Sequence, residues 1–185
     1  MPAADGQWQT FGQRTAYDNR WVRVELVEVQ TSSGARFEHH VVHLGRIAIA
    51  LIVNEREEVL MLYRHRFAVD QWGYELLGGL VEDGEDPAAT AAREALEESG
   101  WQPVGEPEPL ISFEPLPGQV TAPIEVFLWR DARQVGQPSD PDEQGRLEWV
   151  PLASVPTLAG RGQLLGAGTL VALLYYLTRA AQPTS

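Results

Sequence analysis

The alternation of apolar and polar residues predicts a series of strands over the first half of the chain. Residues 21–30 alternate as a half-buried strand does, and residues 36–44 do so again after a Ser-Ser-Gly turn at 32–34. This spacing predicts an antiparallel hairpin. Further strands are expected at residues 46–53, 58–66 and 73–77, the first of them apolar enough for the centre of a sheet.

A helix is predicted at residues 87–99, because both of its ends carry residues that favour a helix boundary. Asp86 is a good N-cap, Pro87 suits the first helical position, and Gly100 suits the position just beyond the last turn. Alanines cover one side of this helix and allow it to approach a sheet closely.

The rest of the chain adds strands and a closing helix. Strands are expected at residues 110–113, 124–130 and 147–150, with residues 102–109 irregular. The apolar to amphipathic residues 164–179 predict the final helix. Strands, a helix, more strands and a helix indicate an α+β fold built in layers.

Composition narrows the classes of function. The 185 residues are 44% hydrophobic, which suits a domain with a substantial core. A net charge of −12 argues against general binding to nucleic acids or anionic membranes. The absence of cysteine excludes disulfides, a thiol nucleophile and zinc–thiolate sites. The N-terminus lacks a secretion-signal pattern, and the apolar run 164–177 is short and rich in glycine, so a cytoplasmic protein is expected.

Five carboxylates gather around the predicted helix and indicate a site for a divalent cation. Glu94 and Glu98 lie one turn apart on one face, with Glu97 beside them, while Glu82 and Glu85 precede the helix. The alternative is an ordinary solvated helix face. Like charges at this spacing and anions near a helix C-terminus are both unfavourable, which favours a functional reason for the cluster. Hard cations such as Mg²⁺ prefer carboxylate oxygens and share them with phosphates.

The same segment resembles the Nudix box. Gly79, five residues, Glu85, seven residues and then the run 93–101 (Arg-Glu-Ala-Leu-Glu-Glu-Ser-Gly-Trp) fill every fixed Gly, Glu and Arg of that pattern. Ala95 stands where a larger aliphatic residue is usual, and Trp101 replaces an aliphatic one. The resemblance implies an α/β/α sandwich with a mixed sheet. It also implies Mg²⁺-dependent hydrolysis of a nucleoside diphosphate linked to another group.

Features outside the box are similar to the ADP-ribose pyrophosphatase branch. Members of this branch carry an N-terminal antiparallel strand pair, which residues 1–45 would supply as a dimerisation-type extension before a hydrolase domain at 46–185. Arg66 and Glu75 match positions of the branch, and Pro117 lies sixteen residues after Trp101, as a branch proline does. Two departures are Leu77, in place of a proline, and the absence of an acidic residue within 120–123.

The resemblance implies a role for each candidate site residue. Glu94, Glu97, Glu98 and the Gly78 carbonyl would hold Mg²⁺, with Mn²⁺ as a substitute, and Glu97 and Glu98 would thereby take part in catalysis. A late acidic loop would supply the base that orients or deprotonates water: Glu143, with Asp140 and Asp142 as alternatives. Substrate contacts are expected from Arg66, Glu75, Trp72, Pro117 and Gly118, and structural roles from Gly79, Glu85, Arg93 and Gly100.

Some of these assignments have a plain structural alternative. Trp72 could stack on a base or belong to the core. Arg93 is expected to hold the box together by pairing with Glu85 or a neighbour. Arg64 and Arg66 share a strand face, which favours a phosphate grip, although Arg64 also fits an exposed strand edge.

The expected reaction is hydrolysis of ADP-ribose to AMP and ribose 5-phosphate by a homodimer. One alternative is another nucleoside diphosphate sugar, a dinucleoside polyphosphate or a coenzyme as the substrate of the same kind of enzyme. The other alternative is a non-catalytic Nudix-fold ligand sensor. Such sensors usually lose carboxylates of the box, and this chain retains all of them.

Overall fold

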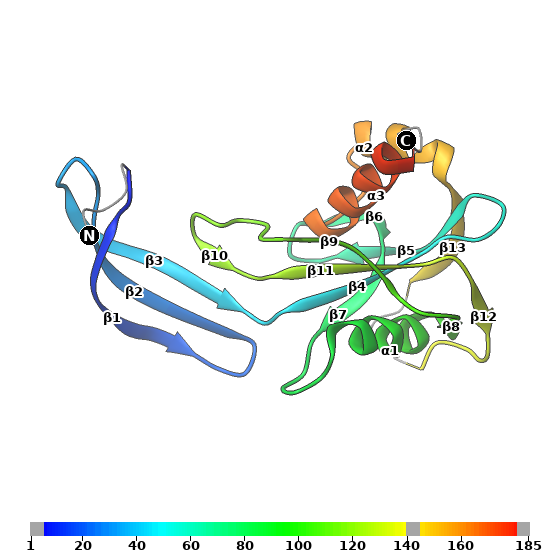
Figure 1. Cartoon of the computed structure of the whole chain (residues 1–185), viewed down its shortest axis with the longest axis horizontal. Helices are drawn as coiled ribbons and strands as arrows, with labels where there is room; N and C mark the ends of the chain where they lie inside the picture. The colour runs from blue at the N-terminus through cyan, green and yellow to red at the C-terminus, as the bar shows by residue number, and fades with distance from the viewer. Residues whose placement is uncertain (1–5, 140–144, 181–185) are drawn as a thin grey trace. The chain divides into compact units, whose positions relative to one another are not determined.

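The computed structural model describes residues 6–139 and 145–180, and it divides the chain into two units (Figure 1). The first unit comprises Met1–Gly45 together with Glu114–Pro123, and the second comprises Arg46–Phe113 together with Ile124–Ser185. The division assigned from the sequence placed all of 46–185 in one domain, whereas residues 114–123 group with the N-terminal strands.

The first unit is a four-stranded sheet in the order β1-β2-β3-β10. β1 (Gln9–Asp18), β2 (Val22–Gln30) and β3 (Arg36–Leu44) form an antiparallel meander, which confirms the predicted hairpin as β2 and β3. β10 (Val120–Thr121) pairs with β3 in parallel. β1 was not predicted, because its residues are exposed on both faces and therefore show no alternation of burial.

Two histidines of β3 hold residues 114–123 within the first unit. The ring Nε2 of His39 hydrogen-bonds the carbonyl oxygen of Gly118 at 2.9 Å. The ring Nδ1 of His43 lies 2.8 Å from the hydroxyl of Thr121, and its Nε2 lies 2.9 Å from the carboxylate of Glu25. The histidines of β3 therefore have a structural role, because they bind residues 114–123 and β2 to this strand.

The second unit contains the remaining strands and all the helices in the described part of the chain. One sheet runs β7-β4-β11-β9 and another β13-β5-β6, with a small pair β12-β8. The strands are β4 (Ile47–Ile52), β5 (Glu58–Arg66), β6 (Gln71–Glu75), β7 (Leu77–Leu80), β8 (Trp101–Pro103), β9 (Glu108–Phe113), β11 (Ile124–Trp129), β12 (Ala132–Gln134) and β13 (Arg146–Pro151). The helices are α1 (Pro87–Ser99), the 3₁₀ turn η1 (Leu152–Ser154), α2 (Val155–Gly160) and α3 (Ala167–Ala180).

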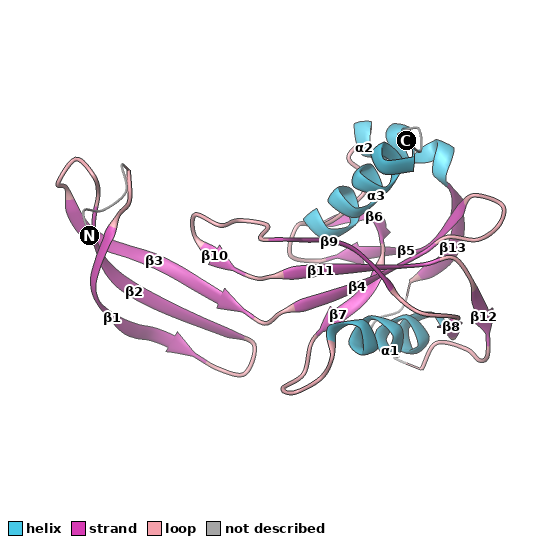
Figure 2. Ribbon diagram, viewed as in Figure 1, coloured by secondary structure: helices cyan, strands magenta, loops and turns pink. Residues whose placement is uncertain are grey.

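These strands lie between two helical layers, so the predicted α/β/α sandwich is confirmed (Figure 2). β4 shows why: Ile49 and Leu51 join a core that includes α3 residues, while Ala48, Ala50 and Ile52 join a core that includes α1 residues. Both faces of β4 are buried, which explains its continuous apolar sequence. β4 and β11 are parallel and their other neighbours antiparallel, so the sheet is mixed as predicted.

Several predicted boundaries need correction. The strand expected at 73–77 is two strands in different sheets, because the chain turns at Leu76, whose N–H donates to the Thr169 hydroxyl at 3.0 Å. The region expected to be irregular, 102–109, contains β8 and the start of β9, whose partners are distant in sequence. The final helix begins at Ala167, after Gly166 with a φ of 74°.

No helix within the described residues is long and apolar enough to cross a membrane.

Candidate active site

The predicted caps fix both ends of α1. The Asp86 side chain accepts a hydrogen bond from Ala89 N–H at 3.0 Å, and Pro87 occupies the first turn. Gly100 ends the helix in the left-handed region with a φ of 72°, and its N–H donates to the Leu96 carbonyl at 2.7 Å. A β-carbon on Gly100 would also meet the backbone of Gly136, so glycine is needed there for two reasons.

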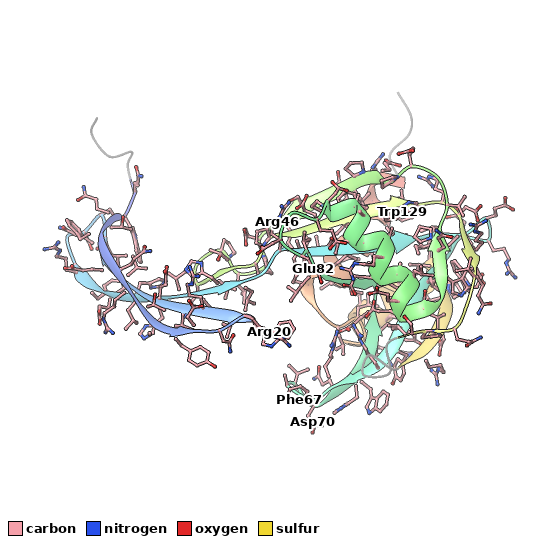
Figure 3. The ribbon with its side chains drawn as sticks, turned by 90° about the horizontal axis from the view of Figure 1, so that it is seen from below. Arg20, Arg46, Phe67, Asp70, Glu82 and Trp129 are labelled. Carbon is pink, nitrogen blue, oxygen red and sulfur yellow. The ribbon has the colours of Figure 1, made fainter. Side chains whose placement is uncertain are left out.

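Glycines of β7 bring the helix close to the sheet, and in the view from below α1 lies in front of β4 and β7 (Figure 3). A β-carbon on Gly79 would collide with the carboxylate of Glu94. A β-carbon on Gly78 would collide with the carbonyl oxygen of Ala48 on β4. Gly79 therefore leaves the space that the Glu94 carboxylate occupies, and Gly78 allows β7 to lie close to β4.

The first group of charges is the Arg93 cluster, which consists of Arg93, Glu85, Glu94 and Glu97. Arg93 binds the Glu85 carboxylate through Nε and Nη2, at 3.0 and 3.1 Å. Its Nη1 donates to Glu94 and to Glu97, both at 2.9 Å. About a third of the Arg93 side chain is exposed, at 33%. The expected ion pair with Glu85 is present, and one guanidinium offsets the repulsion among three carboxylates.

The Arg93 guanidinium also sets the protonation of Glu85. Its hydrogen bonds favour the charged carboxylate and lower the pKa of Glu85 to about 2. The same contact raises the pKa of Arg93 above its ordinary value. Glu85 is therefore ionised throughout the neutral range and acts as a fixed anion for Arg93.

The second group is the Arg64 cluster, which consists of Arg64, Arg66, Glu75 and Glu98. Arg64 donates from Nη1 to Glu98 at 3.0 Å and from Nε to Glu75 at 2.7 Å. Glu98 also accepts from the Gly78 N–H at 2.9 Å. Arg64 and Glu98 are 5% and 3% exposed, so this pair is buried. Arg64 therefore does not lie at an exposed strand edge, the alternative considered from the sequence.

Arg66 joins this cluster from its solvent side. Its Nε and Nη2 bind the same Glu75 carboxylate, at 3.0 and 2.7 Å to Oε2, while its side chain remains 43% exposed. Glu75 therefore links an accessible arginine to a buried one. The structure places the predicted substrate residue Glu75 against two arginines, where it positions them.

The predicted base-stacking residue Trp72 lies on the other face of β5 and β6. Arg64, Arg66 and Glu75 share the strand face of Leu62, which packs in the core that includes α1 residues. Trp72 alternates to the opposite face, where it stacks on Tyr63 with ring centroids 5.7 Å apart and remains 60% exposed. The structure therefore does not bring Trp72 to the glutamates of the box, and it also places Trp72 outside the core.

The remaining predicted residues lie elsewhere. Pro117 and Gly118 belong to the first unit, where they line a cavity of about 460 Å³ together with His39 and the neighbouring residues 115, 116 and 119. Glu143 and its alternatives Asp140 and Asp142 lie outside the described residues. Gly145, where the described chain resumes, lies against Arg64 Cβ and the Tyr63 carbonyl.

The donor set of α1 fits a hard divalent cation. Glu94 and Glu97 accept hydrogen bonds from the same nitrogen of Arg93, so their oxygens lie near each other, and all the donors are oxygens. Within the described residues, however, no three acidic or histidine side chains already converge on one point. Arg93 thus binds two of the predicted ligands, Glu94 and Glu97, and Arg64 binds the third, Glu98. A cation would compete with Arg93 for Glu94 and Glu97.

Arg64 is the functional candidate that sequence reasoning left without a definite role. A signal was available in the alternation of β5, where Leu60, Leu62 and Arg64 share a face and the two leucines are fully buried. An arginine that continues a buried row needs an internal acid as its partner. Which acid it meets is a matter of tertiary structure, since Arg64 and Glu98 are 34 residues apart.

Comparisons with known proteins agree with this geometry. The NUDIX domain family model matches residues 43–165. A CMP-5′-(N-acetyl-N-hydroxy-3-aminopropyl)phosphonate hydrolase of Streptomyces rubellomurinus is 40% identical over 171 residues, which cover 92% of this chain and 82% of that protein. An ADP-ribose pyrophosphatase of Mycobacterium tuberculosis is 26% identical over 175 residues, covering 92% and 84%. A solved structure described as an ADP compounds hydrolase superposes with a TM-score of 0.77 at 18% identity, covering 95% and 96%, and supports the fold.

Proposed function

Since the chain belongs to the Nudix family and is a Nudix pyrophosphohydrolase acting on nucleoside diphosphate derivatives, we propose that it hydrolyses ADP-ribose to AMP and ribose 5-phosphate with Mg²⁺. The observation that carries this proposal is the row of glutamates on α1 beside an accessible arginine, Arg66. Carboxylates suit a cation, and a guanidinium suits the phosphate oxygens that the cation also binds.

Glu94, Glu97 and Glu98, assisted by the Gly78 carbonyl, are the residues that would hold the cation. A bound divalent cation neutralises phosphate charge and makes water more acidic. The close approach of Glu94 to Gly79 supports a ligand role, because this carboxylate occupies space that any side chain at residue 79 would fill. Mn²⁺ has the same preference for oxygen ligands and is expected to replace Mg²⁺.

Arg66 binds the phosphate that leaves. Its side chain is 43% exposed, and its hydrogen bonds to Glu75 fix its orientation. A carboxylate of the late acidic loop, with Glu143 the first choice, takes the proton of the attacking water. The oxygen of that water becomes bonded to one phosphorus, the bridging P–O bond breaks, and its electron pair stays with the departing phosphate.

A second candidate substrate is a CMP-linked phosphonate. The relative that is 40% identical is described as a hydrolase of such a compound. Leu77 and the absence of an acidic residue within 120–123 also depart from the ADP-ribose branch. The reaction would be of the same type, because in both compounds a nucleoside monophosphate is joined through phosphorus to a second group.

A substrate panel tests the proposal. The purified protein is incubated with ADP-ribose, a CMP-linked phosphonate, GDP-mannose and a dinucleoside polyphosphate, each with Mg²⁺, Mn²⁺ or EDTA, and the products are separated by ion-exchange chromatography. The expected result is release of AMP from ADP-ribose in the presence of either cation and none with EDTA. Preferential release of CMP from the phosphonate would select the second candidate, and nucleotide binding without turnover of any of the four compounds would contradict both candidate substrates.

The protein is also proposed to act as a homodimer through its first unit. In this unit Trp8, Phe11 and Phe37 are each more than two-fifths exposed. Exposed aromatics and open strand edges favour a covering partner. Light scattering coupled to size-exclusion chromatography is expected to give a mass about twice the chain mass of 20.5 kDa. A mass equal to one chain at micromolar concentration would contradict the dimer.

A further inference from the structure

The buried position of Arg64 needs an explanation, because an ion pair inside a protein stabilises the fold little. Arg64 and Glu98 are both almost fully buried. Apolar residues of similar volume would serve stability as well or better, since both charges lose their hydration. The two residues that precede Arg64 on its β5 face, Leu60 and Leu62, are buried leucines, so an arginine that continues this row has a use other than filling the core.

The contacts of Glu98 show what that use is. One carboxylate oxygen accepts from Arg64 at 3.0 Å, and the other accepts from the Gly78 N–H at 2.9 Å. Donors from two different strands therefore fix the plane of the carboxylate. A carboxylate oxygen has two lone pairs, so an oxygen that accepts a hydrogen bond can also ligate a cation.

Arg64 is itself held in place from the opposite side. Its Nε donates to Glu75 at 2.7 Å, and Glu75 is only 12% exposed in its side chain. Because the guanidinium is planar, fixing Nε also fixes the direction of Nη1 toward Glu98. Lysine has one point charge and cannot make both contacts with this geometry.

We propose that Arg64 is a positioning residue that orients the Glu98 carboxylate for the divalent cation, an inference that rests on the proposed function. Outer groups that orient a ligand typically affect metal affinity 10- to 100-fold when they are removed. Glu75 extends the arrangement to Arg66, because both arginines bind its Oε2. Consecutive ion pairs from Glu98 through Arg64 and Glu75 to Arg66 thus connect the proposed cation ligand to the proposed phosphate-binding arginine.

Electrostatics alone predicts the opposite effect of removing Arg64. The Arg64 cluster holds two arginines and two glutamates, so replacing Arg64 by a neutral residue makes its charge more negative by one. A more negative site attracts a cation more strongly. A loss of cation affinity in a neutral variant would therefore report positioning and not charge.

The test measures Mn²⁺ affinity of the full chain without nucleotide, from the electron paramagnetic resonance signal of free Mn²⁺. Arg64→Gln is expected to bind Mn²⁺ about 10-fold more weakly than the wild type, with Arg64→Lys between them. Arg146→Gln is the matched control, since Arg146 lies on β13 of the same sheet opposite Tyr63 and is bound to Glu148. Its affinity is expected to stay within about twofold of the wild type.

A double-mutant cycle distinguishes action through Glu98 from a general loss of structure. In a Glu98→Gln background, Arg64→Gln is expected to weaken Mn²⁺ binding by less than about twofold, because the group that Arg64 orients is already gone. Equal losses in both backgrounds, or an Arg64→Gln variant that binds Mn²⁺ as tightly as the wild type or more tightly, would overturn the proposal.

Folding of each variant is checked by circular dichroism before titration. If Arg64→Gln does not fold, Arg64→Lys retains the buried charge and takes its place in the cycle, with the same criteria. A wild type that binds no Mn²⁺ would overturn the proposed metal-dependent function and this inference with it. A wild type that binds Mn²⁺ while the cycle shows no coupling would overturn this inference alone.

Discussion

Two arginines share the glutamates of α1, and they do so in opposite surroundings. Arg93 is a third exposed and binds Glu85, Glu94 and Glu97, all within eight residues of it in sequence. Arg64 is buried and binds Glu98 from a strand 34 residues away. The Arg93 cluster therefore organises one segment of chain, whereas the Arg64 cluster ties the helix to the sheet.

The difference in burial affects how much the ion pairs of each cluster contribute to the stability of the fold. Solvent screens the Arg93 cluster, so its ion pairs contribute little to stability and can yield to a cation. In the Arg64 cluster, Arg64 and Glu98 have lost nearly all of their hydration, so each depends on the other as its partner. We infer that the partly exposed Arg93 cluster gathers the proposed ligands and that the buried pair of Arg64 and Glu98 fixes the geometry of one of them. The following experiments, from the largest expected effect to the smallest, test this contrast.

The largest contrast is expected in stability. Arg64→Met should lower the free energy of unfolding by about 3–5 kcal/mol, because it leaves Glu98 buried without this cation. Arg93→Met should lower it by about 1 kcal/mol, because the carboxylates it leaves can be hydrated. Urea unfolding in EDTA at pH 7 measures both. Similar losses for the two variants would show that burial does not separate the clusters, and the double variant Arg64→Met/Glu98→Met should recover most of the first loss.

The next effect is on turnover. Glu98→Gln should lower kcat roughly 100-fold or more, since a ligand contributes at least as much as the groups that orient it. Steady-state assays on the preferred substrate measure this. Glu108→Gln is the control, because Glu108 lies on β9 and pairs with Arg179 away from the box. A Glu98→Gln enzyme that retains more than about a tenth of wild-type turnover contradicts the assignment of Glu98.

A smaller effect is expected from Gly79→Ala, which perturbs a ligand of the Arg93 cluster alone. The new methyl group would meet the Glu94 carboxylate, the mobile end of a side chain that can move away. Turnover should fall roughly 10-fold, while the free energy of unfolding changes by less than about 1 kcal/mol. Gly160→Ala, with no atom within 4 Å of the added carbon, is the control for both assays. Unchanged turnover in Gly79→Ala would remove Glu94 from the site.

The smallest effect concerns the acid sensitivity of the Arg93 cluster. Arg93 lowers the pKa of Glu85 from 4.5 to about 2, so this pair stabilises the folded state above pH 4.5 and loses that contribution as the pH falls toward 2. The wild type should therefore exceed Glu85→Gln in free energy of unfolding by about 1 kcal/mol at pH 6. The two proteins should converge near pH 2. A difference that is constant between pH 6 and pH 2 would show that the carboxylate does not titrate in this range.

The parts of the fold that the sequence predicted are those specified by neighbouring residues. The hairpin of β2 and β3, the caps of α1 and the buried strand β4 all follow from local patterns. β8 and β12 were not predicted, because each has only three residues and finds its partner about thirty residues away. β1 was missed because neither of its faces is buried.

In the candidate site, too, contacts between residues close in sequence were predicted, whereas those that depend on strand register were not. The ion pair of Arg93 with Glu85 was expected from the spacing of the box, since helix geometry and one short loop bring them together. The strand face on which Trp72 lies was not predicted. The strand register must be known before alternating residues can be assigned to one face of the sheet or the other. The same uncertainty left Arg64 with two alternative roles.

By itself, the sequence determined the family, the helix that carries the glutamates and the chemistry that their oxygens favour. Each of these depends on residue type and on spacing along one segment. Only the tertiary structure decided that Arg64 and the Gly78 N–H hold Glu98, that Trp72 lies on the opposite face, and that residues 114–123 belong with the N-terminal strands. These facts depend on pairing between distant strands and on burial, which makes Arg64 an internal partner of Glu98.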